Sequence, residues 1–181
     1  MTNESAFNST LGQYFITALQ ELYWSETHLV SVLSTMSDEA SSTELQEAFR
    51  THRDQTMIHS QRLEHIFDSL QVPAQQMHCV GLQGLFDEGW KVINETQAGT
   101  AQRDVALIIA AQKVEHYEMA IYGSLVTLAR TLGLRDVAKR LKQTLEEEKE
   151  TDALLTDLAE ADINEEASEE PAAVVQNTNQ K

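Results

Sequence analysis

The stretch KVEHYEMAIYGSL, residues 113–125, places acidic side chains inside an apolar pattern of helical spacing. Val114, Ile121 and Leu125 fall on one helix face with Glu118, because steps of three and four residues return to the same side. A carboxylate buried without a cation must raise its pKa or bind a metal ion. Glu118 is therefore a candidate metal ligand, and Glu115 beside it is either a ligand or a solvated neighbour.

Three other apolar stripes of helical spacing carry polar residues of the same kind, and no Lys or Arg occupies a stripe position. Carboxylates with an imidazole on four facing helices are typical of di-iron and di-manganese sites, because these hard ions prefer oxygen and imidazole ligands. We therefore expect two iron ions, with manganese as the alternative. The further candidate ligands are Glu26, Gln55, His59, Glu148 and Asp152.

The candidate ligands are expected at one level of the bundle. In an antiparallel hairpin, residues equidistant from the turn face each other. The midpoint between Glu26 and Gln55 falls in the stretch SDEASS, and the midpoint between Glu118 and Glu148 falls at Gly133, a residue type that favours chain reversal. Both hairpins should therefore bring their polar residues together inside the protein.

Two further histidines, His52 and His116, are interpreted as hydrogen-bonded neighbours that orient the carboxylates. The positioning elements are long helices, since only two Pro and seven Gly interrupt the chain. About thirty residues separate the second and third helices, which is long enough for a crossover. The sequence thus predicts an all-α, ferritin-like four-helix bundle with a short extra helix in the crossover. The predicted helices cover residues 10–36, 42–70, 82–95, 102–132 and 134–160.

Composition and charge limit the classes of function. The chain has 181 residues, a formal net charge of −16 and a single cysteine. Such a charge disfavours nucleic acid and membrane surfaces as partners and favours cations. Neither a signal peptide nor an apolar run of spanning length is recognisable, so we expect a cytoplasmic protein. The expected organisation is an N-terminal extension (1–9), a bundle domain (10–161) and an acidic disordered tail (162–181).

Five sequence blocks resemble the YciE/YciF family of ferritin-like proteins over roughly residues 10–160. The blocks are ELYWSETHLVSVL, THRDQTMIHSQRLEHIF, CVGLQGLFDEG, RDVALIIAAQKVEHYEMAIYGSL and LEEEKETDALL. The resemblance implies a ferritin-like domain, a homodimer, a role in the bacterial stress response and di-iron ferroxidase-type activity.

The resemblance also implies a ligand set. Its members would be Glu26, His59, Glu118, Glu148 and Asp152, whereas Gln55 departs from a family segment expected to carry Glu. Two functions follow. The first is a ferroxidase that oxidises Fe(II) with dioxygen or peroxide, with Glu118 as the bridging carboxylate. The alternative is a non-enzymatic dimeric helical-bundle stress protein with a degenerate or empty metal site.

Overall fold

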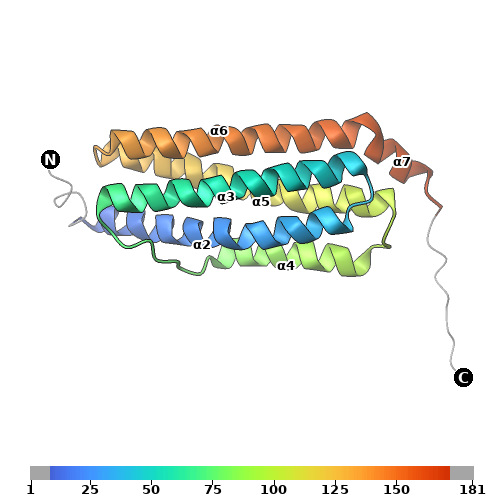
Figure 1. The fold of residues 1–181 in the computed structure, drawn as a ribbon, viewed down its shortest axis with the longest axis horizontal. Coiled ribbons are helices and arrows are strands. Elements are labelled where there is room, and N and C mark those ends of the chain that lie inside the picture. The colour runs from blue at the N-terminus through green and yellow to red at the C-terminus, as the bar shows by residue number, and fades with distance from the viewer. Residues whose placement is uncertain (1–8, 172–181) are drawn as a thin grey trace, which may run out of the picture.

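The computed structural model describes residues 9–171, in which four long helices run side by side as two hairpins (Figure 1). The first hairpin turns at residues 40–42 and the second at residues 132–134, where Gly133 has a φ of 78°. That left-handed conformation suits glycine, as the sequence predicted. The four helices are α2 (Thr10–Glu39), α3 (Thr43–Leu70), α5 (Ala101–Thr131) and α6 (Arg135–Leu158).

The long connection between α3 and α5 carries helix α4 (Val80–Glu95), which packs along α2 and α5 (Figure 1). Trp24 of α2 lies against Phe86 of α4, with ring centroids 6.2 Å apart. This crossover lets α5 start from the same end of the bundle as α3. The ferritin-like topology predicted from the sequence is therefore confirmed, and the predicted helix limits agree with the structure within a few residues.

Side-chain caps explain why three of the helices begin where they do. Ser9, Ser42 and Thr100 precede α2, α3 and α5, and the hydroxyl of each accepts a hydrogen bond from a backbone N–H in the first turn. These N–H groups have no partner within the helix, so each cap satisfies one of them. The limits of the helices are thus encoded locally.

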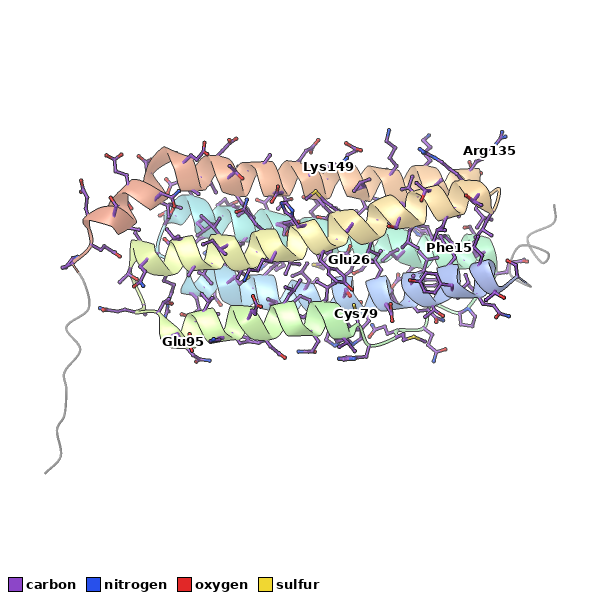
Figure 2. All side chains as sticks on the ribbon, turned by 180° about the vertical axis from the view of Figure 1, so that it is seen from behind. Phe15, Glu26, Cys79, Glu95, Arg135 and Lys149 are labelled. Carbon is purple, nitrogen blue, oxygen red and sulfur yellow. The ribbon has the colours of Figure 1, made fainter. Side chains whose placement is uncertain are left out.

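Two apolar clusters fill the interior, one toward each end of the bundle. In α2, for example, Leu22 belongs to one cluster and Leu29 to the other. Helices α3, α5 and α6 show the same change of cluster along their length. Figure 2 shows Glu26 of α2 near the middle of the bundle, whereas Phe15 lies toward one end. A buried polar layer therefore crosses the bundle between the two clusters.

The segment after α6 differs from the predicted disordered tail over residues 162–170. A π-helical turn, η1 (Ala159–Ile163), leads into α7 (Asn164–Glu169). Ile163 is buried in the apolar cluster at that end, and the Glu170 carboxylate accepts hydrogen bonds from the backbone N–H groups of Ala101 and Gln102. A buried apolar side chain and a carboxylate at the positive end of a helix both hold this acidic segment against the bundle. Residues 172–181 of the predicted tail and 1–8 of the predicted extension lie outside the described residues.

None of the helices in the described part of the chain has the length and apolar character needed to cross a membrane.

Candidate metal centre

The polar layer contains six side chains contributed by all four long helices. Each is at most 4% exposed to solvent. Helix α2 supplies one of them, α3 supplies both histidines, α5 supplies two carboxylates and α6 supplies one. The six residues are Glu26, His52, His59, Glu115, Glu118 and Glu148.

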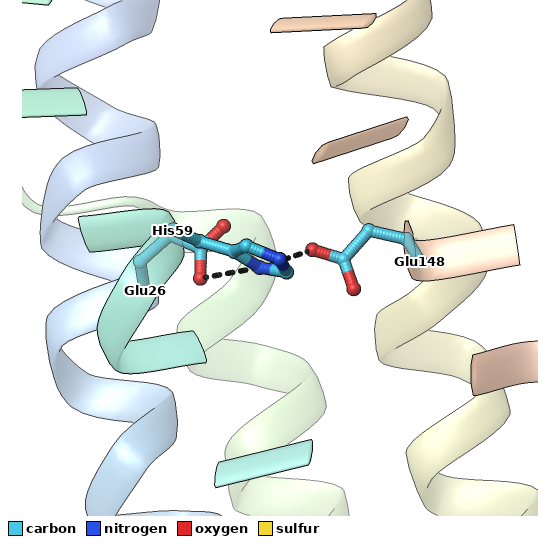
Figure 3. Close-up of side chains that lie close together, drawn as sticks. All are labelled: Glu26, His59 and Glu148. Carbon is cyan, nitrogen blue, oxygen red and sulfur yellow. Dashed lines mark ion pairs between the residues drawn. The ribbon is translucent and has the colours of Figure 1, made fainter. Parts of the chain in front are cut away.

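The first group of possible ligands consists of Glu26, His59 and Glu148. Figure 3 shows the His59 ring lying between the two carboxylates, which approach it from α2 and α6. The ring Nδ1 is 2.8 Å from Glu148 Oε1 and 3.6 Å from Glu26 Oε2. One donor atom from each of the three residues lies within 4.8 Å of the others, so one cation could contact all three.

The second group consists of His52, Glu115 and Glu148, and its donor atoms also lie within 4.8 Å of one another. His52 Nε2 is 3.0 Å from Glu115 Oε1. Glu148 belongs to both groups, which makes it the carboxylate that could join two neighbouring cations. Glu118 is the bridging carboxylate expected from the sequence. Glu118 is fully buried in the same layer but is a member of neither group.

Most atoms of the layer lack a hydrogen-bond partner. Nine buried side-chain nitrogen and oxygen atoms of the described residues are unpaired, and eight of them belong to the six residues of the layer; the ninth is Ser60 Oγ. The contacts of His52 Nε2 and His59 Nδ1 with the carboxylates of the layer are therefore short but not aligned as hydrogen bonds. Each unsatisfied buried group costs roughly 1–3 kcal/mol. Cations bound by the two ligand groups would satisfy the unpaired atoms of the residues in those groups, so the residues present fit a metal centre.

Burial and mutual repulsion change the acidity of the carboxyl groups in the layer. Burial, followed by repulsion from Glu26 and Glu148, raises the pKa of Glu118 well above its ordinary value. Burial also raises the pKa of Glu148 to about 7, although the interaction with His59 opposes that change. The metal-free layer thus lowers its negative charge by retaining protons.

The histidines of the layer retain protons for the opposite reason. Burial disfavours a charged imidazole, but the surrounding carboxylates outweigh this effect. Glu115 is the main carboxylate that raises the pKa of His52 to about 9. Glu26 and Glu148 raise the pKa of His59 to about 11. Without metal, protonated imidazoles compensate part of the carboxylate charge.

His59 is oriented by a second carboxylate on the outer side of the layer. Its Nε2 is 2.9 Å from Glu147 Oε2, and Arg62 donates two hydrogen bonds to the same carboxylate at 2.6 and 3.2 Å. The Arg62 guanidinium lowers the pKa of Glu147 against the opposing effect of burial. An ionised Glu147 accepts a hydrogen bond from the Nε2–H group, so the opposite nitrogen, Nδ1, is the one available to a metal.

Glu26 is held in a comparable way. The buried Tyr122 hydroxyl donates a hydrogen bond to Glu26 Oε1, which leaves Oε2 facing His59. Tyr122, Arg62 and Glu147 are not among the ligands predicted from the sequence. Arg62 follows His59 by about one helical turn and Glu147 directly precedes Glu148, so the spacing in the sequence already indicates that both lie near the ligands. Their direct contact with the ligands depends on the rotation of each helix.

Asp152 is a member of neither ligand group, and Gln55 lies in the wall of a cavity beside them. Asp152 is half-buried and faces α5, where its Oδ1 lies 3.3 Å from the exposed His116 Nε2 and accepts a hydrogen bond from Gln112. Gln55 is also half-buried, and it lines a cavity between α3 and α6. The predicted members that do come together are Glu26, His59, Glu115 and Glu148, and His52 joins them.

The fold and the layer define a ferritin-like four-helix bundle with a buried cluster of carboxylates and imidazoles. The chain belongs to the family described as Domain of unknown function (DUF892), which matches residues 10–168. It is 43% identical to Protein YciF of Escherichia coli strain K12 over 159 residues, or 87% of this chain and 95% of YciF. The resemblance to the YciE/YciF family is thereby confirmed.

Solved structures show the same fold. The crystal structure of the E. coli stress protein YciF has a TM-score of 0.81, covering 86% of this chain and 98% of that one at 43% identity. YcfI from Rhodopseudomonas palustris has a TM-score of 0.78 at 28% identity, covering 82% of this chain and 94% of its own. A protein from Xanthomonas campestris at 20% identity shares the fold with a TM-score of 0.69 over 86% and 95% of the chains.

Proposed function

We propose that this protein is a ferritin-like di-metal carboxylate protein with ferroxidase-type activity that oxidises Fe(II) with dioxygen or peroxide. The observation that carries the proposal is that Glu148 belongs to two adjacent buried ligand groups whose donor atoms lack hydrogen-bond partners. Hard oxygen ligands with one imidazole in each group suit iron, with manganese as the alternative ion. Iron would supply the electrons that reduce the oxidant.

Each ligand group has a defined part in this proposal. Glu26 and His59 would hold one ion, His52 and Glu115 would hold the other, and Glu148 would contact both. Glu118 adds a further buried carboxylate to the layer. Tyr122 fixes Glu26, and Glu147 fixes the tautomer of His59, so the protein sets the geometry before an ion arrives.

The cellular setting of the proposal rests on the sequence and on a relative. The E. coli YciF structure is described as that of a stress protein, and we propose a stress-related role for this chain as well. We further propose that the protein is cytoplasmic and forms a homodimer. The acidic chain, with its net charge of −16, would raise the local concentration of Fe(II).

The experiment that tests the proposal counts bound ions in the wild type and three variants. After purification without chelators, elemental analysis and metal titration should find two ions per wild-type chain. Glu148→Gln should lose both ions, whereas Glu26→Gln and Glu115→Gln should each lose one. Fe(II) oxidation should fall in all three variants.

The matched control is Glu146→Gln, because Glu146 lies on α6 and is half exposed in an ion pair with Lys149. This control should retain both ions and full Fe(II) oxidation. If the wild type binds no iron or manganese, the ferroxidase proposal is wrong. Loss of both ions in Glu26→Gln would contradict the division into two groups.

A non-enzymatic structural bundle is the second candidate. Protonated histidines next to carboxylates reduce the charge of the layer without metal, as the raised pKa values of His52 and His59 show. YcfI from R. palustris is also described, provisionally, as a structural protein. This candidate predicts no stoichiometric metal, and Glu148→Gln would then change only stability.

A further inference from the structure

A cavity of about 190 Å³ lies between α3 and α6 beside the polar layer. Its lining combines apolar side chains with carboxylate, amide, hydroxyl and imidazole groups. The main lining residues are Phe49, His52, Gln55, Glu150, Thr151 and Leu154. Exposed Glu150 and Leu154 lie at its outer side, whereas His52 and Thr151 are buried at its inner side.

His52 connects this cavity with the ligand groups. Its ring lines the cavity and its Nε2 lies 3.0 Å from Glu115, a member of the second group. The other ring nitrogen, Nδ1, is 3.4 Å from the Thr151 hydroxyl, which also lines the cavity. A cation that reached the inner end of the cavity would therefore meet His52 before the other ligands.

The alternative approaches to the layer fit an ion less well. A larger cavity of about 640 Å³ between α4 and α5 is lined by Ile109, His116 and Tyr117, among others, but by no member of either ligand group. A cavity that does reach Glu115 has a volume of only about 10 Å³, and its other lining residues are apolar. An ion loses its water shell more readily along a wall of oxygen atoms than along an apolar wall.

We infer that the cavity between α3 and α6 is the passage by which divalent cations enter the centre, with Gln55 and Glu150 as the groups that guide them. This inference rests on the proposed function. The Glu150 carboxylate attracts the cation at the exposed side, and the Gln55 amide and Thr151 hydroxyl replace water along the way. Gln55 makes no hydrogen bond through its side chain within the described residues, so its amide oxygen is free for this use.

The passage assigns Gln55 a role that differs from that of a permanent ligand. A residue in the passage changes how fast an ion arrives, whereas a ligand changes how tightly the ion is held. Gln55→Glu places a negative charge in the cavity and should raise the association rate of Co(II) by about tenfold at low ionic strength. The number of ions bound at equilibrium should remain that of the wild type.

The decisive experiment blocks the passage without touching a ligand. Leu154 is 44% exposed at the outer side, and Leu154→Trp should fill the opening. Stopped-flow absorption of Co(II), a spectroscopic probe for divalent cations, should show association slowed by about tenfold, with unchanged equilibrium stoichiometry. The matched control is Ile109→Trp, because Ile109 is 51% exposed and lines the larger cavity between α4 and α5.

The outcomes separate the two proposals. Slow loading in Leu154→Trp with normal loading in Ile109→Trp supports the passage. Normal loading in Leu154→Trp, or slow loading only in Ile109→Trp, overturns the passage while stoichiometric Co(II) binding still supports the centre. If the wild type binds no Co(II), Mn(II) or Fe(II) at equilibrium, the centre itself is wrong and the passage falls with it.

Discussion

His59 reaches the polar layer through one ring nitrogen and is held by the other. The Glu147 carboxylate accepts a hydrogen bond from His59 Nε2, and Arg62 holds that carboxylate in place through two hydrogen bonds. Such second contacts set the tautomer of a metal-binding histidine and increase its basicity. The orientation of His59 is thus determined by residues that do not belong to either ligand group.

Glu147→Gln should weaken metal binding at the Glu26–His59 position by about 10–100-fold, because an amide can present its NH₂ group to Nε2 and favour the wrong tautomer. Binding at the His52–Glu115 position should change little. Titration with Co(II) can resolve the two positions, with Glu146→Gln as the control on the same helix. Equal weakening at both positions would contradict this role for Glu147.

The metal-free protein should lose stability as the pH rises from about 5 to about 9. Glu148 has a folded pKa of about 7 against an ordinary value of 4.5, so its stabilising proton is lost through that interval. His52 has a folded pKa of about 9 against 6.5, and its contribution, complete below 6.5, disappears as the pH approaches 9. Both effects have the same sign because the folded state binds protons more tightly than the unfolded state.

Thermal unfolding in the presence of a chelator measures this pH dependence. Glu118→Gln should make it weaker, because Glu118 also has a raised pKa and its replacement cannot ionise. The same variant should leave the metal-free protein as stable as the wild type, or more stable, at pH 8. An unchanged slope in Glu118→Gln would show that the buried carboxyl groups do not determine the effect.

The sequence predicted which kinds of side chain form the site better than which particular residues do. Carboxylates in apolar stripes identified Glu26 and Glu148, since helical spacing alone places them inside. Asp152 lies one turn after Glu148 and was expected beside it, but the structure turns it toward Gln112 and His116. A small rotation of α6 about its axis determines which way Asp152 faces, and that rotation cannot be read from the spacing of residues in a single sequence.

At the scale of elements, helix α4 approaches α5 closely at Gly81, where α4 faces Tyr117. A Cβ atom added at Gly81 would lie 2.6 Å from Tyr117 Oη and 2.7 Å from Tyr117 Cε2. Tyr117 also pairs with the buried Cys79 just before α4, at 3.4 Å between oxygen and sulfur. The crossover helix can approach α5 this closely because position 81 has no side chain.

Gly81→Ala should therefore destabilise the protein by about 1–3 kcal/mol through overpacking against Tyr117. Gly84→Ala provides a matched control on the same helix, because a Cβ there would meet nothing within 4 Å. The control should stabilise the helix by roughly 0.5–1 kcal/mol. Chemical denaturation of both variants measures the difference, and equal effects would refute the contact.

Helix limits were predictable because their signals are local. Apolar periodicity, capping hydroxyls and Gly133 all act within a few residues of the chain, and the structure follows them. The helical segment after residue 158 was missed for the opposite reason. Its acidic composition resembles a disordered tail, whereas its order depends on contacts of Ile163 and Glu170 with distant residues.

At the scale of the whole molecule, the C-terminal segment closes one end of the bundle. Ile163 is 4% exposed and belongs to the same apolar cluster as Leu155 and Ala40. Glu170 then caps the first turn of α5 through Ala101 and Gln102. We propose on this basis that the folded domain extends to Glu170, beyond the limit of 161 expected from the sequence.

Ile163→Ala should lower the free energy of unfolding by about 2–4 kcal/mol, because it removes buried methyl and methylene groups from that cluster. Ile58→Ala is the control, since Ile58 is 52% exposed on α3, and its effect should stay within about 0.5 kcal/mol. Urea denaturation measures both values. A small effect of Ile163→Ala would restore the interpretation of this segment as a dispensable tail.

If the polar layer binds metal ions as proposed, the raised pKa values of its residues would make metal uptake an exchange of protons for metal cations. A metal ligand must be deprotonated, so Glu148, His52 and His59 would each give up the proton that they hold more tightly than usual. Protons would then leave the interior as cations enter it. The net charge of the core would change by less than the charge of the bound divalent ions alone. The empty and loaded proteins would share one architecture, and the acidity of the surroundings would control which of them is present.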